Sequence, residues 1–531
     1  MVIKKKRLNT ILEIVIIFFI GFLLGGTSGS PFYGDVNVID EGQFAAWANH
    51  MLHGKFLFKD IYVTYGPLYV YPLYLLSKIF GPSMFLVRAY ITIGALVGIY
   101  AVNEILKQFK IEKLLRYLTL VLFALLPIMQ LRQAVGYIIL LFLFKGIETR
   151  KLRWFFFCGI SLATCFLISP EIGIFSAIII FLYYSYTLVT ADIIRIVFQR
   201  ISVFLLGILF IVIPFSLWTE YEGWLTAYIV GTEDILTSLS GINSPNGQNF
   251  PNPYTLFPVT LDPILLFKFI FSQDMMLYWT IFIYLLIVGY IVIRMALQKR
   301  DRKDVYITMI GLYGVLMYTI LLSRNGIGHF FFTLSPLIIL IVYFIDKALR
   351  IVKQKKSKRI EKSVALIGVL AISLFVLRLL AINRPEIIKK FTFPFSVSLF
   401  KQNPVRFGPM SVSSVQEQQL SIIQNYILQQ TTEKDNIFLF SNEPVVYMLV
   451  DRINPTRYDL PFVANPLEKR LELIFDLTRN PPRYIIENQK SWAVDGVSNR
   501  QRLPEVYEYL EKQYHKTAVI GNYIVYEINR Q

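Results

Sequence analysis

The chain has 531 residues, of which 55% are hydrophobic and 17% are charged, and its mean hydropathy is +0.52. Soluble globular proteins carry about 25% charged residues, so this composition excludes an ordinary soluble protein. The net charge of +17 does not indicate a nucleic-acid partner, because the Lys and Arg residues gather in short loops between apolar runs.

Eleven apolar runs approach the ~20 residues that a helix needs to cross a bilayer. They lie at residues 10–29, 83–106, 115–131, 133–149, 154–169, 171–190, 200–219, 276–296, 304–323, 328–348 and 363–382. We therefore predict a polytopic α-helical membrane protein with about eleven transmembrane helices. A basic stretch precedes the first run, as in a signal peptide, but no convincing cleavage site follows it. We therefore interpret this run as a retained span.

The basic residues predict the orientation of these spans. The loop at 219–275 carries one Lys and six acidic residues, whereas five other loops are basic. The basic loops are 107–116, 145–153, 195–200, 294–303 and 347–362. By the positive-inside rule, the N-terminus is cytoplasmic and residues 30–82, 219–275 and 383–531 lie outside. We expect a multi-pass protein of the cell membrane, surrounded by membrane lipids.

The outer segment 30–82 is too apolar for a free loop. Residues 41–53 predict an amphipathic helix, and residues 68–80 form a second apolar stretch that Pro72 interrupts. Short helices lying along the membrane interface fit both stretches.

The composition becomes that of a soluble protein after residue 412. We predict a transmembrane domain at 1–382, a linker at 383–411 and a small extracytoplasmic α/β domain at 412–531. Its expected strands are 436–440, 483–487 and 523–528, and its expected helices are 416–430, 467–477 and 503–513. Gly521-Asn522 between two apolar runs indicates a hairpin turn.

Asp40 and Glu41 follow the first span directly and are the strongest candidates for chemistry. Asp40 and Gln43 have the spacing of a capping box for the following helix, with Glu41 stabilised by the helix dipole. Alternatively, one carboxylate accepts a proton from an attacking hydroxyl as a general base. The two roles can coexist.

Five further residues are candidates for binding a substrate or a metal ion. Tyr62 and Tyr65 offer amphipathic rings for a membrane interface or a sugar. Glu171 lies at the outer end of two apolar runs, where an ionisable group indicates either substrate binding or the polar turn of a helical hairpin. His50 and His53 share one helix face near the acids, and a divalent metal there is conceivable, but two polar-face histidines explain the spacing equally well. We predict no metal site.

These features together resemble the membrane-embedded C-type glycosyltransferase superfamily, which includes bacterial relatives of the protein O-mannosyltransferases and aminoarabinose transferases. The resemblance rests on Asp40-Glu41-Gly42 after the first span, the segment from Asp60 to Pro67, the turn from Arg324 to His329, and the soluble outer domain. It implies transfer of a sugar from a polyprenyl-phosphate donor to a hydroxyl acceptor on an envelope glycan, lipid or protein.

By this resemblance, Asp40 is the general base, with Glu41 beside it. Arg324 and His329 are positioned to hold the donor phosphate, with Arg88 and Arg132 as weaker candidates, or else to contact lipid headgroups and begin a helix. Some relatives have a second functional carboxylate in a later outer loop. The sequence does not choose among Glu220, Glu222, Glu233, Asp234 and Asp262.

Two other classes of function remain open. A transporter or flippase of lipid-linked sugars predicts buried mid-span charges and related halves, and a non-catalytic envelope scaffold predicts that the acids serve only helix capping. The sequence contains no phosphate-binding P-loop, no dinucleotide fingerprint and no zincin motif, so a nucleotide-driven pump is excluded and no cofactor is indicated.

Overall fold

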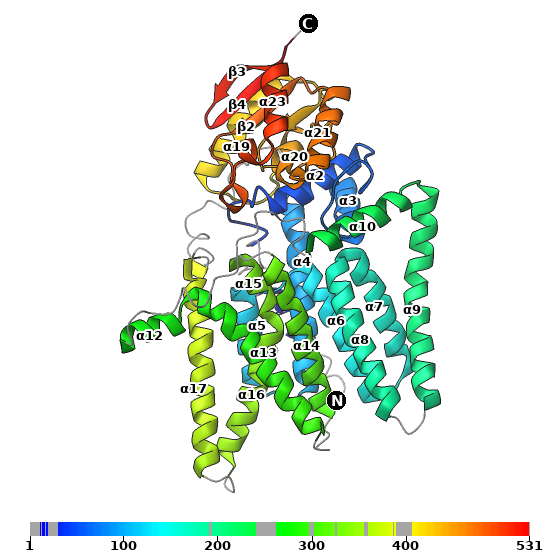
Figure 1. Cartoon of the computed structure of the whole chain (residues 1–531), viewed down its shortest axis with the longest axis vertical. Coiled ribbons are helices and arrows are strands. Elements are labelled where there is room, and N and C mark those ends of the chain that lie inside the picture. The colour runs from blue at the N-terminus through cyan, green and yellow to red at the C-terminus, as the bar shows by residue number, and fades with distance from the viewer. Residues whose placement is uncertain are drawn as a thin grey trace. The chain divides into compact units, whose positions relative to one another are not determined.

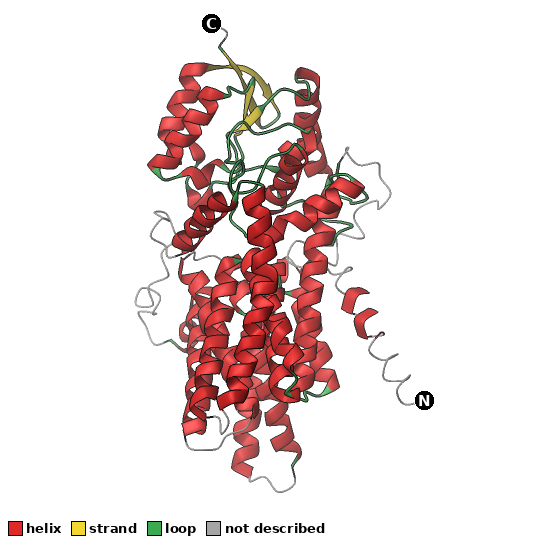
Figure 2. Cartoon of the chain, turned by 90° about the vertical axis from the view of Figure 1, so that its right-hand side faces the viewer, coloured by secondary structure: helices red, strands yellow, loops and turns green. Residues whose placement is uncertain are grey.

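The computed structural model describes residues 11, 13–15, 17–19, 30–190, 194–239, 262–296, 302–323, 327–354, 359–385, 387–388 and 406–529. Most of the expected first span at 10–29 lies outside these residues. The described chain is mainly helical, and its strands gather in one small region (Figure 2). The fold class predicted from composition is confirmed at this level.

Six described helices are long and apolar enough to cross a membrane. They are α4 (Met84–Gln108), α8 (Pro170–Thr190), α9 (Ile194–Tyr221), α13 (Gln273–Ala296), α14 (Arg302–Ser323) and α17 (Arg359–Ile382). Three shorter helices occupy other expected spans, namely α5 (Lys113–Leu125), α6 (Leu131–Thr149) and α7 (Leu152–Ile168). The number of eleven spans stays a prediction.

The chain forms two compact units that do not follow its order. Unit 1 contains residues 1–27, 92–214 and 247–391, and unit 2 contains residues 28–91, 215–246 and 392–531. Each of α4 and α9 has residues in both units.

Unit 1 is a set of packed helices, in which α6 packs on α7, α7 on α8, and α13 on α14 (Figure 1). Glycines permit the closest of these approaches. A Cβ atom added at Gly159 would lie 2.0 Å from the carbonyl oxygen of Phe204, and one at Gly207 would lie 2.2 Å from that of Phe156. Small residues allow such backbone contact between helices in membranes.

The expected span at 328–348 is not one helix. The short helix α15 (Ile327–Thr333) ends before Leu334, and α16 (Ser335–Lys353) begins after it. Pro336 explains the break, because proline cannot donate the hydrogen bond that would continue α15 and restricts the residue before it. Pro72, in contrast, does not break a helix. The helix α3 (Pro67–Phe80) continues through this proline, which we expected to interrupt it.

Unit 2 is built around α2 (Asp40–Leu52), which packs against α3 and against α20 (Val445–Val450). Every residue of α2 from Glu41 to Met51 is buried, so the prediction of an amphipathic helix lying along the interface is wrong. Gly42 makes the contact with α20 possible, since a Cβ atom there would lie 2.7 Å from the backbone nitrogen of Val445.

The C-terminal part of unit 2 has the expected α/β character. Its four strands, β1 (Ile437–Leu439), β2 (Tyr484–Asn488), β3 (Tyr514–Ile520) and β4 (Tyr523–Ile528), form a sheet in the order β1-β2-β4-β3. Only β1 and β2 pair in parallel. The accompanying helices are α19 (Ser414–Gln430), α21 (Leu467–Arg479), α22 (Asn499–Arg502) and α23 (Pro504–Gln513). Gly521, with φ of +59°, forms the β3–β4 turn.

The hydrophobic core of this part lies between the sheet and its helices. Phe438 and Ile485 of the parallel strands are fully buried against Leu473 and Leu477 of α21. The crossover from β1 to β2 through α21 therefore buries one face of the sheet, as parallel pairing requires.

A buried acid follows strand β1. The Glu443 carboxylate accepts hydrogen bonds from Asn488 Nδ2 at 2.6 Å and from the Tyr523 hydroxyl at 3.0 Å. Burial raises the pKa of Glu443 above its ordinary value, and the two hydrogen bonds oppose this rise only in part. Folding therefore stabilises the protonated form.

We expect the stability of this α/β part to fall as pH rises. A carboxyl whose folded pKa is raised contributes stability that is complete below its unfolded pKa and is lost as pH passes its folded pKa. Hydrogen exchange of the β1 and β2 amides in the full chain, corrected for intrinsic rates, should show less protection at neutral than at acidic pH. Glu443→Gln should remove that difference, and an unchanged difference in this variant would contradict the assignment.

Candidate functional site

The start of α2 is held by Asn37 rather than by Asp40. The Asn37 side-chain oxygen accepts hydrogen bonds from the backbone N–H groups of Ile39 at 3.1 Å and Asp40 at 3.0 Å. The Asn37 N–H donates to the Glu41 carboxylate at 3.0 Å. The expected capping box of Asp40 and Gln43 is therefore wrong, because Asp40 is already inside the helix and the Gln43 N–H donates to the Ile39 carbonyl at 2.7 Å.

Glu41 forms a buried ion pair with Arg88 of α4. Both side chains are almost completely inaccessible, with exposed fractions of 1% and 0%. Arg88 Nε lies 2.9 Å from Oε1, and Arg88 Nη2 lies 3.0 Å from Oε2, so the guanidinium binds the carboxylate in a bidentate manner. Arg88 Nη1 also donates to the Gly34 carbonyl at 2.8 Å. The Arg88 guanidinium is therefore engaged by Glu41 and by a backbone carbonyl of the same unit.

Asp40, in contrast, is exposed. Its carboxylate accepts a hydrogen bond from Asn37 Nδ2 at 2.9 Å and lies in the first turn of a helix whose residues from Glu41 to Met51 are buried. Two adjacent acids thus have different environments, since Glu41 is buried in an ion pair and Asp40 is exposed.

Asp234 is brought to Tyr62 by the fold of unit 2. Asp234 belongs to α10 (Leu225–Leu239), and its Oδ2 accepts a hydrogen bond from the Tyr62 hydroxyl at 2.8 Å. The same oxygen lies 2.6 Å from Lys469 Nζ on α21. Burial, followed by the charge of Asp234, raises the pKa of Tyr62, so its hydroxyl stays protonated and donates. Three distant chain segments therefore meet at one carboxylate.

The rings of the two candidate tyrosines have protein neighbours. The Lys469 ammonium lies 4.7 Å from the centre of the Tyr62 ring, and Tyr458 packs against the same ring at 5.4 Å. Tyr65 stacks on Tyr69 at 4.7 Å and approaches Phe44 at 5.5 Å. Both rings are half-buried. Their expected role in substrate binding stays a prediction.

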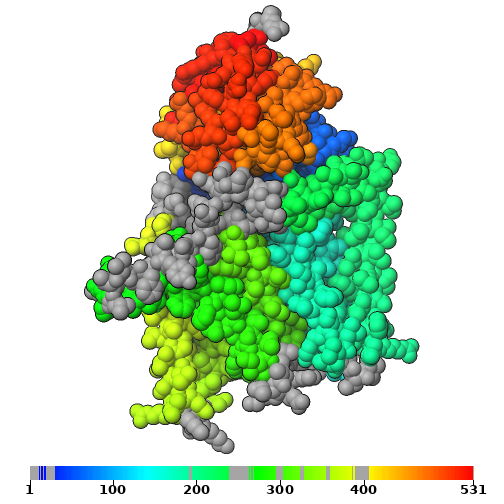
Figure 3. Space-filling model, viewed as in Figure 1, coloured from blue at the N-terminus to red at the C-terminus, as the bar shows by residue number. Residues whose placement is uncertain are grey.

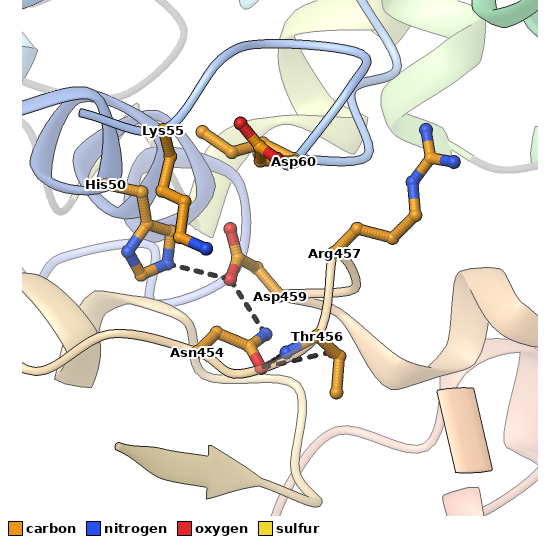
Figure 4. A pocket seen from close by; sticks show the side chains of 8 residues that line it. His50, Lys55, Asp60, Asn454, Thr456, Arg457 and Asp459 are labelled. Atoms are coloured by element: carbon orange, nitrogen blue, oxygen red, sulfur yellow. Dashed lines mark hydrogen bonds and ion pairs between the residues drawn. The ribbon is translucent and has the colours of Figure 1, made fainter. Parts of the chain in front are cut away.

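The C-terminal half of α2 carries a second buried pair. His50 Nε2 lies 2.9 Å from Asp459 Oδ1, and the side-chain amide of Asn454 donates to the same oxygen at 3.0 Å (Figure 4). Lys55 and Arg457 also line this pocket, which is too narrow to admit a water molecule. The pair therefore fixes α2 against the 454–459 loop and leaves no room for a ligand.

The two histidines do not form a metal site together. His50 faces Asp459, whereas His53 Nε2 lies 3.5 Å from Asp451 and its Nδ1 lies 2.9 Å from the Asn49 carbonyl oxygen. Among the residues that the structure describes, no group of three or more His, Cys, Asp or Glu side chains could hold a metal ion.

Unit 1 brings three other candidates near one aromatic ring. Glu171 begins α8 and is buried, and its Oε1 lies 3.3 Å from Arg132 Nη1 on α6. The Arg132 guanidinium lies 5.1 Å from the Phe332 ring centre, and the His329 ring contacts that ring at 6.0 Å. Glu171 is thus a first-turn helix residue with an ion-pair partner. Arg324 lies outside the described residues.

Sequence reasoning missed the partners of the acids. Asp459 and Lys469 carry no local signal, because each acts through a residue more than 400 positions away. Arg88 was considered only as a phosphate ligand. In the expected topology, Arg88 lies near the start of an apolar helix and close to the outer acids. This position was the signal in the sequence that could have indicated an ion pair.

The chain resembles known proteins in its fold rather than in its sequence. No protein-family model and no curated protein matches the sequence. Among solved structures, ArnT from Cupriavidus metallidurans bound to undecaprenyl phosphate matches with 13% identity and a TM-score of 0.51, over 99% of each chain. The archaeal oligosaccharyltransferase AglB from Archaeoglobus fulgidus, in complex with an inhibitory peptide and a dolichol-phosphate, matches with 12% identity and a TM-score of 0.51, over 99% of this chain and 75% of that one.

A second structure of the Archaeoglobus fulgidus oligosaccharyltransferase, tethered with an acceptor peptide, matches with 13% identity and a TM-score of 0.52, over 97% of this chain and 74% of that one. The chain has the fold of membrane-embedded C-type glycosyltransferases. The resemblance expected from the sequence is confirmed at the level of the fold, across nearly the whole chain.

We expect the Glu41–Arg88 pair to be a large contributor to stability. Glu41→Gln or Arg88→Met leaves an uncompensated buried charge, which typically costs about 3–5 kcal/mol. The melting temperature of the purified chain in detergent should fall strongly for each variant. The double variant, which buries no charge, should recover much of the loss.

Asp40→Asn is the matched control for these variants. It removes the same charge from the neighbouring residue, but on an exposed side chain, and it keeps a polar group of similar shape. Its melting temperature should equal that of the wild type. Equal losses for Asp40→Asn and Glu41→Gln would contradict the different roles assigned to the two acids.

Proposed function

We propose that this chain is a glycosyltransferase that moves a sugar from a polyprenyl-phosphate donor to a hydroxyl acceptor at the outer face of a cell membrane. The acceptor belongs to an envelope glycan, lipid or protein. The observation that carries the proposal is an exposed carboxylate, Asp40, mounted at the start of a buried helix in a fold shared with C-type glycosyltransferases. The apolar helices account for a lipid-borne donor.

In the proposed reaction, the acceptor hydroxyl oxygen attacks the anomeric carbon of the donor sugar. A new carbon–oxygen bond forms as the bond from that carbon to the phosphate oxygen breaks. Asp40 takes the hydroxyl proton, and the bond electrons leave with the polyprenyl phosphate. A single displacement of this kind inverts the anomeric centre.

Asp40 suits the role of base better than Glu41 does. A general base must come within hydrogen-bond reach of the proton that it takes, and Asp40 is exposed to such an approach. Both oxygens of Glu41 are held by Arg88 in a closed environment. We therefore assign Glu41 to positioning. That Arg324 and His329 contact the donor phosphate stays a prediction.

We further propose Asp234 as the second functional carboxylate among the five acids that the sequence left open. Its support is the contact with Tyr62 and Lys469, which joins α10, the 56–62 segment and α21. The three side chains form a half-buried polar cluster in which one ammonium and one carboxylate are both partly accessible. Such a cluster can orient an acceptor hydroxyl through hydrogen bonds.

Asp234→Asn should raise the KM for the acceptor by about tenfold, because a charge-assisted hydrogen bond contributes roughly 1.5–3 kcal/mol, and it should change kcat little. Stability should change little as well, since partly exposed ion pairs contribute about 0–1 kcal/mol. Glu233→Gln, an exposed neighbour on the same helix, is the matched control. An unchanged KM in Asp234→Asn would remove Asp234 from the site.

The proposed activity is tested with purified chain in lipid nanodiscs and a panel of polyprenyl-phosphate sugars. We expect release of the polyprenyl phosphate to accompany transfer, with NMR of the product showing an inverted anomeric centre. Retention of the anomeric configuration would rule out direct displacement. Movement of a lipid-linked sugar across liposomes without any transfer would instead establish the flippase function, and inactivity in both assays would favour the scaffold.

A further inference from the structure

Unit 1 contains a cavity that lies apart from the candidate residues of the preceding sections. It lies between the turn that joins α12 (Pro263–Ile270) to α13 and the last two turns of α17. Its volume of about 570 Å³ is within the ~300–1,000 Å³ typical of ligand pockets. On the surface of this unit, α13 and α17 lie next to each other (Figure 3). None of the acids, histidines or tyrosines proposed for sugar transfer lines the cavity.

The wall of the cavity is apolar on one side and cationic on the other. Leu374, Leu377 and Ala381 of α17 supply the apolar side, and Leu377 is 60% exposed. Lys268 and Arg378 supply the positive charge, and no acidic residue lines the cavity within the described part of the chain. A wall of this kind fits a ligand with a hydrocarbon part and an anionic group.

One nitrogen of the Arg378 guanidinium is held by a backbone carbonyl. Arg378 lies one turn before the end of α17, after an apolar stretch that runs from Val364 to Leu377, where a charge is costly and needs a partner. Its Nε donates to the Phe271 carbonyl oxygen at 2.6 Å, which fixes the side chain beside the α12–α13 turn. Neither Arg378 nor Lys268 forms an ion pair with any described acid. The fixed Arg378 and the exposed Lys268 thus line the same space, and neither has a counterion among the residues that the structure describes.

The start of α13 adds to the attraction for an anion. Gln273 is the first residue of this 24-residue helix and lines the cavity. Backbone N–H groups at a helix N-terminus favour phosphate and similar anions. Asp274 in the same turn opposes this attraction, and the Met275 N–H already donates to the Ser272 hydroxyl at 3.2 Å. The cavity shape and the two cations therefore carry the choice of ligand class.

We propose that this cavity binds an anionic membrane phospholipid, with its phosphate against Lys268 and Arg378 and an acyl chain along Leu374, Leu377 and Ala381. A lipid fits better than a soluble anion because α17 is exposed along most of its length, with only 11% of its apolar window buried. The cavity therefore opens toward the hydrocarbon that surrounds the spans. Basic pockets between membrane helices are known lipid headgroup sites. The proposal holds whether or not the chain transfers sugars.

The test uses the full chain in mixed nanodiscs and native mass spectrometry of the lipids that remain bound. Phosphatidylglycerol should be retained in preference to phosphatidylcholine. Lys268→Gln with Arg378→Gln should weaken phosphatidylglycerol binding about 30-fold, because each cation near an anionic lipid contributes roughly a factor of five. Arg378→Lys, which keeps the charge, should retain most of the binding.

The matched control is Arg359→Gln with Arg384→Gln, which removes the same charge from described residues of this helical region that do not line the cavity. Its lipid retention should equal that of the wild type. Equal retention by the cavity variant and the wild type would overturn the proposal, as would equal losses in both double variants. Displacement of phosphatidylglycerol by stoichiometric polyprenyl phosphate would also overturn the proposal and would indicate a site for the carrier lipid. Displacement by inorganic phosphate would overturn it as well and would indicate a site for a soluble anion.

Discussion

Unit 2 depends on the ion pair between Glu41 and Arg88. Transferring two charges into an interior costs several kcal/mol per ion, so such a pair persists only where its geometry and additional hydrogen bonds are good. Here the bidentate contact and the Gly34 carbonyl meet both needs. Because the partners come from α2 and α4, the pair fixes the position and rotation of α2. Any slip of α2 by one residue would separate the charges.

The rest of α2 is fixed by contacts of other kinds. Gly42 lets α20 approach to a distance that any side chain would prevent, and His50 reaches Asp459 near the other end of the helix. A site mounted on such a rigid element keeps its geometry better than a site on a loop. Asp40 is the residue of α2 that these constraints leave exposed. The same helix thus combines a firmly held body with an exposed acid, which is the base of the proposed reaction.

Much of this arrangement could be predicted from local sequence patterns. β4 and α21 match their expected ranges closely because hydropathy and turn residues act over short distances, whereas β3 and the break between α15 and α16 were not expected. The burial of Glu41 in an ion pair beside an exposed Asp40 could not be predicted, since it depends on Arg88, 47 positions away from Glu41. Nor could the sequence single out Asp234, because its contacts with Tyr62 and Lys469 arise only from folding. The buried state of α2 was missed because His50 and His53 were interpreted as residues of a polar, solvent-facing side.

The most direct test of the central claim is the turnover of Asp40→Asn beside that of the wild type, with equal amounts of folded protein and the same polyprenyl-phosphate sugar. Asparagine keeps the shape of the side chain but cannot accept the proton. Loss of a general base typically lowers the rate by about 10²–10⁴-fold, and we predict a loss in this range with an unchanged melting temperature. Turnover equal to that of the wild type would contradict the account and remove Asp40 from the mechanism.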